Sequence, residues 1–331
     1  MCEAPLACGS AAGRENPVVG KDDAVAGVLE GFGIIAVVIA AGYVLGVSGV
    51  LGPDARRVLN RFVFFAAAPC LLFTVLAKAD PNLLVSPLLV VAAGSALVVV
   101  VVSLVVSRLV WHRTAAQAMV TAFASGYVNA NNIGLPVAIY VLGSAAYPAP
   151  VILLQLLVFA PAGLVVLEHS RGGGSVLRTV LLSFRNPLLL GSLLGTVLAL
   201  THVHLPAPVL EPFTLIGGAA VPLMLMGFGM SLHGQRVLEP GSGRRDVVLA
   251  TALKLVGMPI AAWVFGGPLL HLDPRTLDAA VTLAALPTAQ NVLVYASRYD
   301  RSVLVARDAV LLTTIGSLPV VLLVALLLSP R

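Results

Sequence analysis

Residues Ser125–Pro136, SGYVNANNIGLP, lie inside the longest uncharged stretch of the chain, which runs from Thr114 to Leu167. Three asparagines occur within four residues, and Gly134 and Pro136 follow them. Proline lacks a backbone N–H and clashes with the preceding helical turn, so a regular helix cannot continue through this segment. In hydrocarbon, every unsatisfied polar group costs several kcal/mol. The segment therefore predicts a membrane helix that is broken in mid-bilayer and shielded there by protein or by a water-filled cavity.

The uncharged stretch is 54 residues long, and Gly143–Pro150 divides it in two. One spanning helix needs roughly 20 mostly apolar residues. Reading outward between charges and turn residues gives ten candidate spans, at residues 27–47, 57–77, 83–107, 115–142, 148–168, 187–201, 208–232, 247–267, 276–298 and 303–328. The sixth is short, and an amphipathic approach at 175–184 is expected to extend it. The predicted fold class is an all-α integral membrane protein with ten transmembrane helices.

The composition supports a membrane protein over a soluble one. Of the 331 residues, 59% are hydrophobic and only 11% are charged, which is too few to cover a soluble fold of this length. The net charge of +5 does not indicate nucleic-acid binding, because the basic residues follow the loops of the predicted topology. The three cysteines have no disulfide or zinc spacing. Residues 1–25 lack the order of a cleaved signal peptide, so the first helix is expected to act as its own insertion signal.

The basic residues also orient the predicted spans. Alternate loops contain fourteen of the twenty, namely Arg56, Arg57, Arg61, Arg108, Arg113, Arg171, Arg178, Arg185, Arg236, Arg244, Arg245, Arg298, Arg301 and Arg307. The opposite side has only Arg14, Lys21, Lys78, Arg275 and Arg331. By the positive-inside rule the first set is cytoplasmic. The prediction is a multi-pass protein of the plasma (inner) membrane with both termini extracytoplasmic.

The chain also shows signs of an internal repeat. Residues 66–77, AAAPCLLFTVLA, resemble residues 219–230, AAVPLMLMGFGM, and both place a proline inside an apolar helix. The fourth and ninth spans share a Val-Thr pair, at Val120–Thr121 and at Val281–Thr282, and both then become rich in amides. Five spans separate the partners, so the two halves would be inverted, as in many secondary transporters. The alternative is a chance likeness between Ala/Val/Leu-rich helices. The predicted organisation is a tail at 1–25, a first five-helix repeat at 26–168, a cytoplasmic linker at 169–186 and a second repeat at 187–331.

The ninth span provides the counterpart of the first break, Leu286–Asn291, LPTAQN. Two facing breaks would bring half-helix N-termini, with their partial positive charge, to the bilayer centre. Amide side chains add donors without a fixed charge, which suits reversible binding of an anion. The candidate substrate-binding residues are Asn129, Asn131, Asn132, Gln290 and Asn291, and the candidate hinge residues are Gly134, Pro136 and Pro287. The alternative is that the amides only join helices to one another.

Other polar residues are weaker candidates. Lys254 is the deepest basic residue, and an intramembrane charge is a functional hypothesis by default. The alternatives to a direct role in substrate binding are that it pairs with Asp308 or extends to the cytoplasmic face. All six histidines fall at span ends or in loops, which argues against a buried proton relay. The pairs Gly42/Gly46 and Gly191/Gly195 are interpreted as sites of close helix packing.

Several segments resemble the auxin efflux carrier family, which includes the plant PIN-formed carriers and bacterial malonate and malate permeases. The resemblance covers residues 33–328, and its motifs are NRFVFFAAAPCLLF at Asn60–Phe73, NANNIGLP at Asn129–Pro136, RNP at Arg185–Pro187, KLVGMP at Lys254–Pro259 and ALPTAQNVLVYASRY at Ala285–Tyr299. It implies a scaffold domain and a transport domain, with substrate beside crossing fourth and ninth helices. It also implies an elevator movement, a small organic anion as substrate and, in many members, a homodimer.

The resemblance leaves the coupling ion open. The related bile-acid symporters bind sodium near the crossover through acidic side chains, and neither predicted break contains Asp or Glu. Sodium-coupled symport and an anion channel remain alternatives, and so does coupling to protons. An enzyme is excluded on motifs, because the chain has no HExxH, no GxSxG and no pair of membrane aspartates. No cofactor or metal is expected. A receptor or a purely structural membrane protein is a third class.

Overall fold

The protein is described by a computed structural model that covers residues 21–78, 86–144, 147–170, 187–203, 205–232, 238 and 243–328. Within these residues the regular structure is helical, and one isolated antiparallel bridge joins Val128 to Thr288. The α-helices are α1 (Lys21–Ser48), α2 (Ala55–Phe62), α3 (Ala68–Ala77), α5 (Pro87–Val105), α6 (Ala115–Gly126), α7 (Gly134–Tyr140), α8 (Ala149–Leu154), α9 (Ala160–His169), α11 (Pro187–Thr201), α12 (Ala207–Gly218), α13 (Ala220–Leu232), α14 (Arg244–Ala252), α15 (Met258–Val264), α16 (Pro274–Ala285), α17 (Asn291–Tyr299) and α18 (Val303–Leu328).

Short π-helical turns connect several of these helices without breaking them. They are η1 (Val63–Ala67), η2 (Val106–Val110), η3 (Gln155–Phe159), η4 (Leu253–Gly257) and η5 (Phe265–Leu269). Each π-helical turn directly follows an α-helix and continues it. For example, α2, η1 and α3 together form one continuous helical segment.

Six helical segments are long and apolar enough to cross a membrane, namely Ala55–Ala77, Pro87–Val110, Ala149–His169, Ala207–Leu232, Arg244–Leu269 and Val303–Leu328. Two shorter apolar helices are Gly33–Ser48 and Leu190–Thr201. The fourth and ninth predicted spans are each divided into two helices, α6 with α7 and α16 with α17. The all-helical membrane fold and the two breaks are therefore confirmed, while the count of ten and the inversion of the halves stay predictions.

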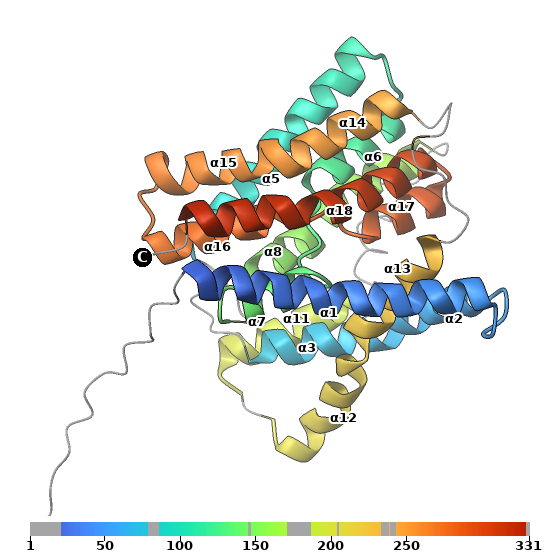
Figure 1. Ribbon diagram of the computed structural model, residues 1–331, viewed down its shortest axis with the longest axis vertical. Coiled ribbons are helices and arrows are strands. Elements are labelled where there is room, and N and C mark those ends of the chain that lie inside the picture. The colour runs from blue at the N-terminus through green and yellow to red at the C-terminus, as the bar shows by residue number, and fades with distance from the viewer. Residues whose placement is uncertain are drawn as a thin grey trace, which may run out of the picture.

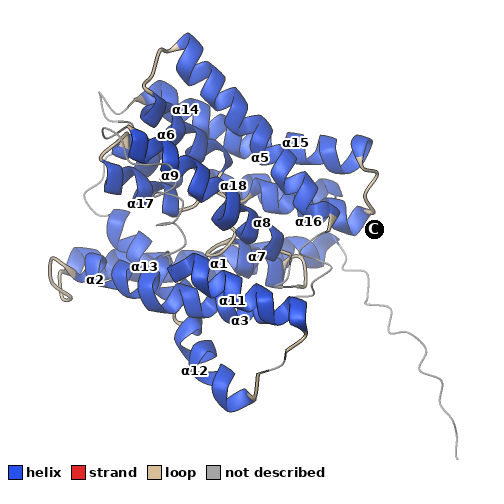
Figure 2. Cartoon of the chain, turned by 180° about the vertical axis from the view of Figure 1, so that it is seen from behind, coloured by secondary structure: helices blue, strands red, loops and turns tan. Residues whose placement is uncertain are grey.

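The helices form two layers (Figure 1). The lower layer of that view contains α1, α2, α3, α11, α12 and α13, with α1 packed on α13 and α3 packed on α11 and α12. The upper layer contains α5, α6, α14, α15, α16, α17 and α18. The layers meet where α1 contacts α18 and α7, and where α11 contacts η3. The reverse view in Figure 2 shows the same division, with α7 and α8 between the layers.

Glycines allow the closest helix contacts of the lower layer. A Cβ on Gly42 would collide with the backbone of Met226, and one on Gly191 would collide with the carbonyl of Pro69. A Cβ on Gly195 would lie 2.5 Å from the carbonyl oxygen of Phe73. The two Gly-x-x-x-Gly pairs therefore allow close packing, as predicted, because only glycine lets these backbones approach.

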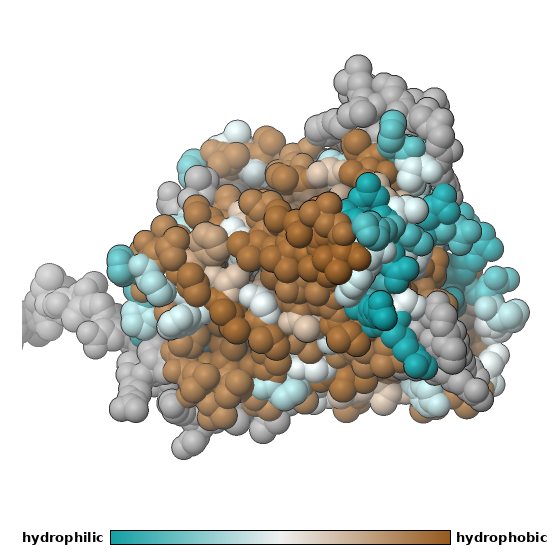
Figure 3. All heavy atoms as spheres, turned by 90° about the horizontal axis from the view of Figure 1, so that it is seen from above, coloured by the Kyte–Doolittle hydropathy of each residue, from teal (hydrophilic) through white to brown (hydrophobic). Residues whose placement is uncertain are grey.

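Apolar residues cover the broad middle of the face shown in Figure 3, and hydrophilic residues gather toward one end of it. Many large apolar side chains are exposed on the helices, among them Val98, Leu215 and Ile260, as expected for a surface that faces lipid. The start of α1 and the end of α18 lie at the same edge of the molecule (Figure 1).

Some predicted boundaries differ from the structure. The first helix begins at Lys21, inside the predicted tail, and the third begins at Pro87, where the fixed φ of proline suits a first helical turn. The predicted approach to the sixth span and most of the predicted linker lie outside the described residues.

Candidate functional site

The first break follows from the residues at the end of α6. The helix begins with a capping box in which Thr114 and Gln117 bind each other's backbone N–H groups. It ends at Gly126, and Tyr127 adopts an extended conformation with φ −86° and ψ 105°. The chain then continues through the three asparagines before α7 begins at Gly134.

The second break has the same form. Leu286, directly after α16, is extended with φ −59° and ψ 153° because Pro287 excludes the helical conformation at the preceding residue. The helix resumes at Asn291 as α17, with Gln290 at its N-cap. Both breaks therefore come from residues that the sequence places there, a proline in one and a cluster of asparagines in the other.

The two breaks satisfy each other's backbone. The N–H of Asn129 donates to the carbonyl of Pro287 at 2.8 Å, and the N–H of Ala289 donates to the carbonyl of Tyr127 at 2.9 Å. These bonds make the bridge between Val128 and Thr288. A backbone group without a partner is costly in hydrocarbon, and this pairing removes the cost for both breaks at once.

Two threonines add further hydrogen bonds at the crossing of the two breaks. The hydroxyl of Thr288 donates to the carbonyl of Ala124 at 2.6 Å, which is one of the free carbonyls at the end of α6. The N–H of Thr288 donates to the hydroxyl of Thr313 on α18 at 3.0 Å. Both threonines are fully buried. The crossing is therefore a rigid, hydrogen-bonded centre of the upper layer.

A cavity of about 30 Å³ lies beside this crossing, between the two layers. All five predicted amides line it, namely Asn129, Asn131, Asn132, Gln290 and Asn291. Its apolar wall comes from Leu72 on α3, Leu188 on α11, Met224 on α13, and Ile152 and Leu156 from the fifth span. Sequence reasoning thus found the polar side of the cavity, but it did not place the lower layer against it.

Two polar residues of the cavity wall were not among the predicted site residues. Gln155 opens η3 and is 5% exposed, and Tyr127 follows α6 and is 2% exposed. Gln155 is the sole amide between Gly143 and Leu167 in the sequence, and this isolation could have identified it as a candidate site residue. Tyr127 had no such signal, because a tyrosine in an apolar helix is common in cores.

The asparagines of the first break bond to one another. The N–H of Asn132 donates to the side-chain oxygen of Asn129 at 3.3 Å, and the amide of Asn131 donates to that of Asn132 at 3.2 Å. Among the described residues the side-chain oxygen of Asn131 has no partner. Asn129 and Asn132 are buried, while Asn131 is partly exposed toward the cavity. The cluster is therefore held in place but retains unused hydrogen-bonding capacity.

The candidate hinge residues lie at the crossing itself. Gly134 is the first residue of α7, and its N–H donates to the carbonyl of Asn129 at 2.9 Å. A Cβ there would lie 3.0 Å from the side chain of Leu286 and 3.3 Å from that carbonyl oxygen. Pro136 is in the first turn of α7, where its missing N–H leaves no gap in the helix. Pro287 supplies the carbonyl that Asn129 binds.

Lys254 and Asp308 do not pair, contrary to the sequence-based expectation. The Lys254 ammonium donates to the carbonyl of Ala284 at 2.7 Å and contacts the sulfur of Met258 at 3.1 Å. Asp308 instead binds Arg307 at 2.7 Å and accepts from the N–H of Leu238 at 2.9 Å. Lys254 is fully buried, so it does not reach the cytoplasmic face either. Ala284 lies in the last turn of α16, where a cation is favourable because carbonyls are free.

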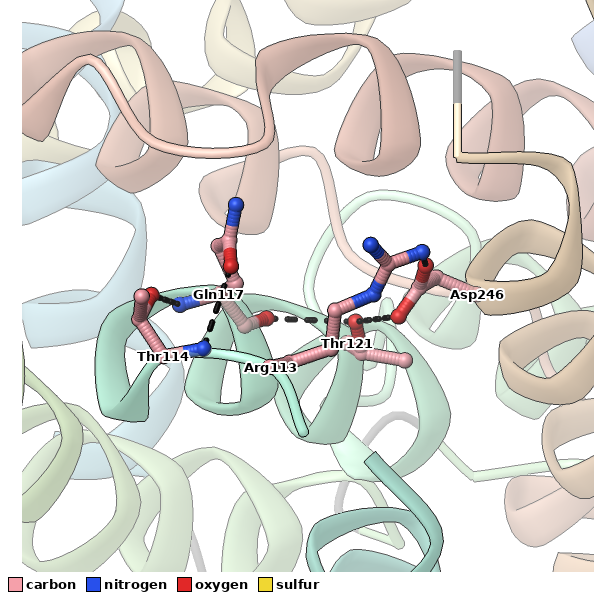
Figure 4. Close-up of polar contacts among 5 residues, drawn as sticks. All are labelled: Arg113, Thr114, Gln117, Thr121 and Asp246. Atoms are coloured by element: carbon pink, nitrogen blue, oxygen red, sulfur yellow. Dashed lines mark hydrogen bonds and ion pairs between the residues drawn. The ribbon is translucent and has the colours of Figure 1, made fainter. Parts of the chain in front are cut away.

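A further ion pair fixes the start of α6 (Figure 4). Asp246, in the first turn of α14, binds Arg113 at 2.6 Å and accepts from the hydroxyl of Thr121 at 3.4 Å. Asp246 is 3% exposed. No group of three His, Cys, Asp or Glu side chains that could hold a metal ion occurs in the part of the chain that the structure describes.

Comparison with known proteins identifies the family of this chain. Residues 28–325 match the family model described as "Membrane transport protein". The chain belongs to this family. Its relatives include auxin efflux carriers, and both the family and the relatives are transporters, not enzymes.

The similar proteins cover most or part of the chain. An "Uncharacterized transporter" of Methanothermobacter thermautotrophicus is 28% identical over 86% of this chain and 93% of its own length. A protein of Rhizobium meliloti named "Putative malonate transporter" is 26% identical over 81% and 85%. A "Probable auxin efflux carrier component 5b" of rice, Oryza sativa subsp. japonica, is 31% identical over 44% and 40%.

Proposed function

We propose that this membrane transporter carries a small organic anion, such as a carboxylate, and that it does so by an elevator-like movement of the upper layer against the lower one. The observation that carries the proposal is the amide-lined cavity between the two layers, beside the crossing of the breaks. The name of the Rhizobium relative, which refers to malonate, supports the same substrate class.

The chemistry of the cavity suits an anion that must be released again. None of the described residues that line it is charged. Gln290 and Asn291, at the N-terminus of α17, bring amide donors and the positive end of the helix dipole to the same wall. Neutral donors bind a carboxylate without the strong attraction of a fixed cation, so release on the other side of the membrane stays fast.

The same wall disfavours sodium-coupled symport. Sodium prefers oxygen ligands with negative charge, and no carboxylate is among the described residues of the cavity wall. Transport that is uncoupled or linked to protons fits the wall better.

The size of the cavity supports a moving carrier over an open channel. One water needs about 10–15 Å³, so a cavity of about 30 Å³ holds roughly two waters and no organic anion. The layers must separate before substrate can enter. Since the polar wall belongs to the upper layer and much of the apolar wall to the lower layer, a relative movement of the two layers would open this cavity.

Purified protein in proteoliposomes would test the proposal. A thermal-shift panel of carboxylates, with and without sodium, would first identify a ligand. Flux of that ligand is expected to saturate and to be stimulated by unlabelled ligand on the opposite side. Asn291→Ala is expected to reduce flux at least tenfold, because it removes a donor at the α17 N-terminus.

Gln117→Ala provides the matched control, because Gln117 is an amide of the α6 capping box and does not line the cavity. It is expected to keep wild-type flux. Conductance that does not saturate would indicate a channel, and unchanged flux in Asn291→Ala would reject the site. A strict sodium requirement would replace the proposed coupling with symport.

A further inference from the structure

Two buried tyrosines stand directly behind the amide wall. Tyr127 lines the cavity at the first break, and Tyr295 comes from the middle of α17. Their rings lie 6.2 Å apart at 71°, and the ring of Phe123 lies 5.6 Å from Tyr127 and 6.1 Å from Tyr295. The three rings form a compact cluster that joins α6 to α17.

The hydroxyls of this cluster lie near polar groups without bonding to them in normal geometry. The two hydroxyls are within hydrogen-bonding range of each other, and the Tyr127 hydroxyl is also within range of the side chain of Asn291. Neither hydroxyl, however, makes a hydrogen bond of normal geometry within the described part of the chain, and both oxygen atoms are inaccessible to solvent. A buried polar group without a hydrogen bond is costly and rare in native proteins.

Packing does not explain these hydroxyls. The contacts of the cluster are between rings, and phenylalanine would make the same contacts without the cost of an unsatisfied hydroxyl. An unsatisfied buried group in a cavity wall needs an explanation, and a partner that is present in only one state of the protein is one such explanation.

We propose that the Tyr127 hydroxyl donates a hydrogen bond to the carboxylate of the bound substrate, and that Tyr295 orients that hydroxyl from behind. The inference rests on the proposed function and extends its site beyond the amides. Tyr127 lies next to Asn291 in the wall, so an anion at the α17 N-terminus is within reach of both when the layers separate. A hydroxyl donor binds a charged carboxylate oxygen more strongly than the neutral carbonyl oxygen of a carboxamide, so it favours the carboxylate.

The test uses the full-length purified protein and malonate as the probe, together with the other carboxylates of the panel. Tyr127→Phe is expected to raise the melting temperature in the absence of ligand by about 2–4 °C, because it removes an unsatisfied hydroxyl. The same change is expected to weaken binding of the carboxylate about tenfold. The opposite signs of the two effects distinguish a binding role from a structural one.

Tyr295→Phe is expected to act in the same directions with a smaller loss of affinity. In the Tyr127→Phe background it is expected to cost no further affinity, because it acts through Tyr127. Tyr299→Phe is the matched control, since Tyr299 is a buried tyrosine on the same helix that does not line the cavity. It should leave ligand affinity unchanged.

Three results would overturn the inference. Tyr127→Phe with wild-type affinity would exclude the hydrogen bond to substrate, while the proposed function would still stand on the amides. A lowered melting temperature would show that the hydroxyl has a structural partner. If no carboxylate acts on the wild-type protein, the proposed function fails and the inference fails with it.

Discussion

Lys254 is a charged side chain placed where charge is expensive, and its contacts explain how it is tolerated. The ammonium binds the carbonyl of Ala284, a group left free by the end of α16 at the second break. The lysine therefore supplies a donor to a helix end that has no water around it. Its stem fills volume between α15, α16 and η4, which pack together.

Lys254→Met is expected to keep the fold, with a melting temperature close to that of the wild type. Methionine fills most of the stem's volume, and replacing a buried charge by an apolar group of similar size is often neutral or stabilising. Lys254→Ala is expected to lose about 2–5 kcal/mol, since both variants free the Ala284 carbonyl but only alanine also leaves a void. Thermal unfolding in detergent measures both, and equal losses in the two variants would show that the charge itself stabilises the fold.

The ion pair between Arg113 and Asp246 gives a second prediction for single residues, which concerns the stability of the fold. Arg113→Met leaves a buried carboxylate that keeps, among the described residues, Thr121 as its partner, so stability should fall by about 2–3 kcal/mol, less than for a fully buried pair. Asp246→Asn in the same background should recover part of the loss, because no charge is then left unpaired. Melting temperatures of the two single variants and the double variant give the coupling, and purely additive losses would contradict it.

Residue patterns predicted part of the candidate site and missed the rest for a physical reason. The asparagines, Pro136 and Pro287 were found because such residues conflict with a lipid-exposed helix. Tyr127 was missed because it does not conflict with one. The contact of Lys254 with Ala284 could not be predicted either, since no periodicity gives the distance between side chains on different helices.

At the scale of contacts between helices, glycines determine which helices can pack closely. Gly191→Ala is expected to destabilise the protein, because the added Cβ would collide with the backbone of Pro69 on α3. Helices cannot separate locally without losing neighbouring contacts, so the melting temperature should fall by several degrees.

Gly218→Ala is the matched control, since a Cβ on Gly218 would meet nothing within 4 Å. It is expected to be neutral or slightly stabilising, as alanine favours the helix. Similar melting temperatures for the two variants would show that the packing of α3 on α11 tolerates a methyl group.

The helix pairs also support the proposed repeat. The first predicted span, α1, packs on the seventh, α13, and the second span packs through α3 on the sixth, α11. An internal twofold that exchanges the halves would convert the first pair into the second. The gaps between charges and turn residues predicted the place of several helices, with residues 115–142 against the observed α6 and α7, but they had no information on which spans pair.

At the scale of the whole molecule, the charge distribution predicts how the protein sits in the membrane. Two single-cysteine variants in a background without the native cysteines would test the orientation. Val50→Cys places the thiol in the loop before Arg56, and Arg275→Cys places it on the side with few basic residues. By the positive-inside rule, a membrane-impermeant thiol reagent added to intact cells should label residue 275 and spare residue 50. The reverse pattern would invert the proposed orientation, while labelling of both would contradict the topology.

The mutual hydrogen bonds of the two breaks have a consequence for biosynthesis. Asn129 and Pro287 belong to parts of the chain that are made at different times, yet each completes the other's backbone. When the first half has left the ribosome, its fourth span still has unpaired groups that lipid cannot accept. The fourth predicted span can reach its final structure only after the ninth has been translated. The first half is therefore not expected to fold by itself.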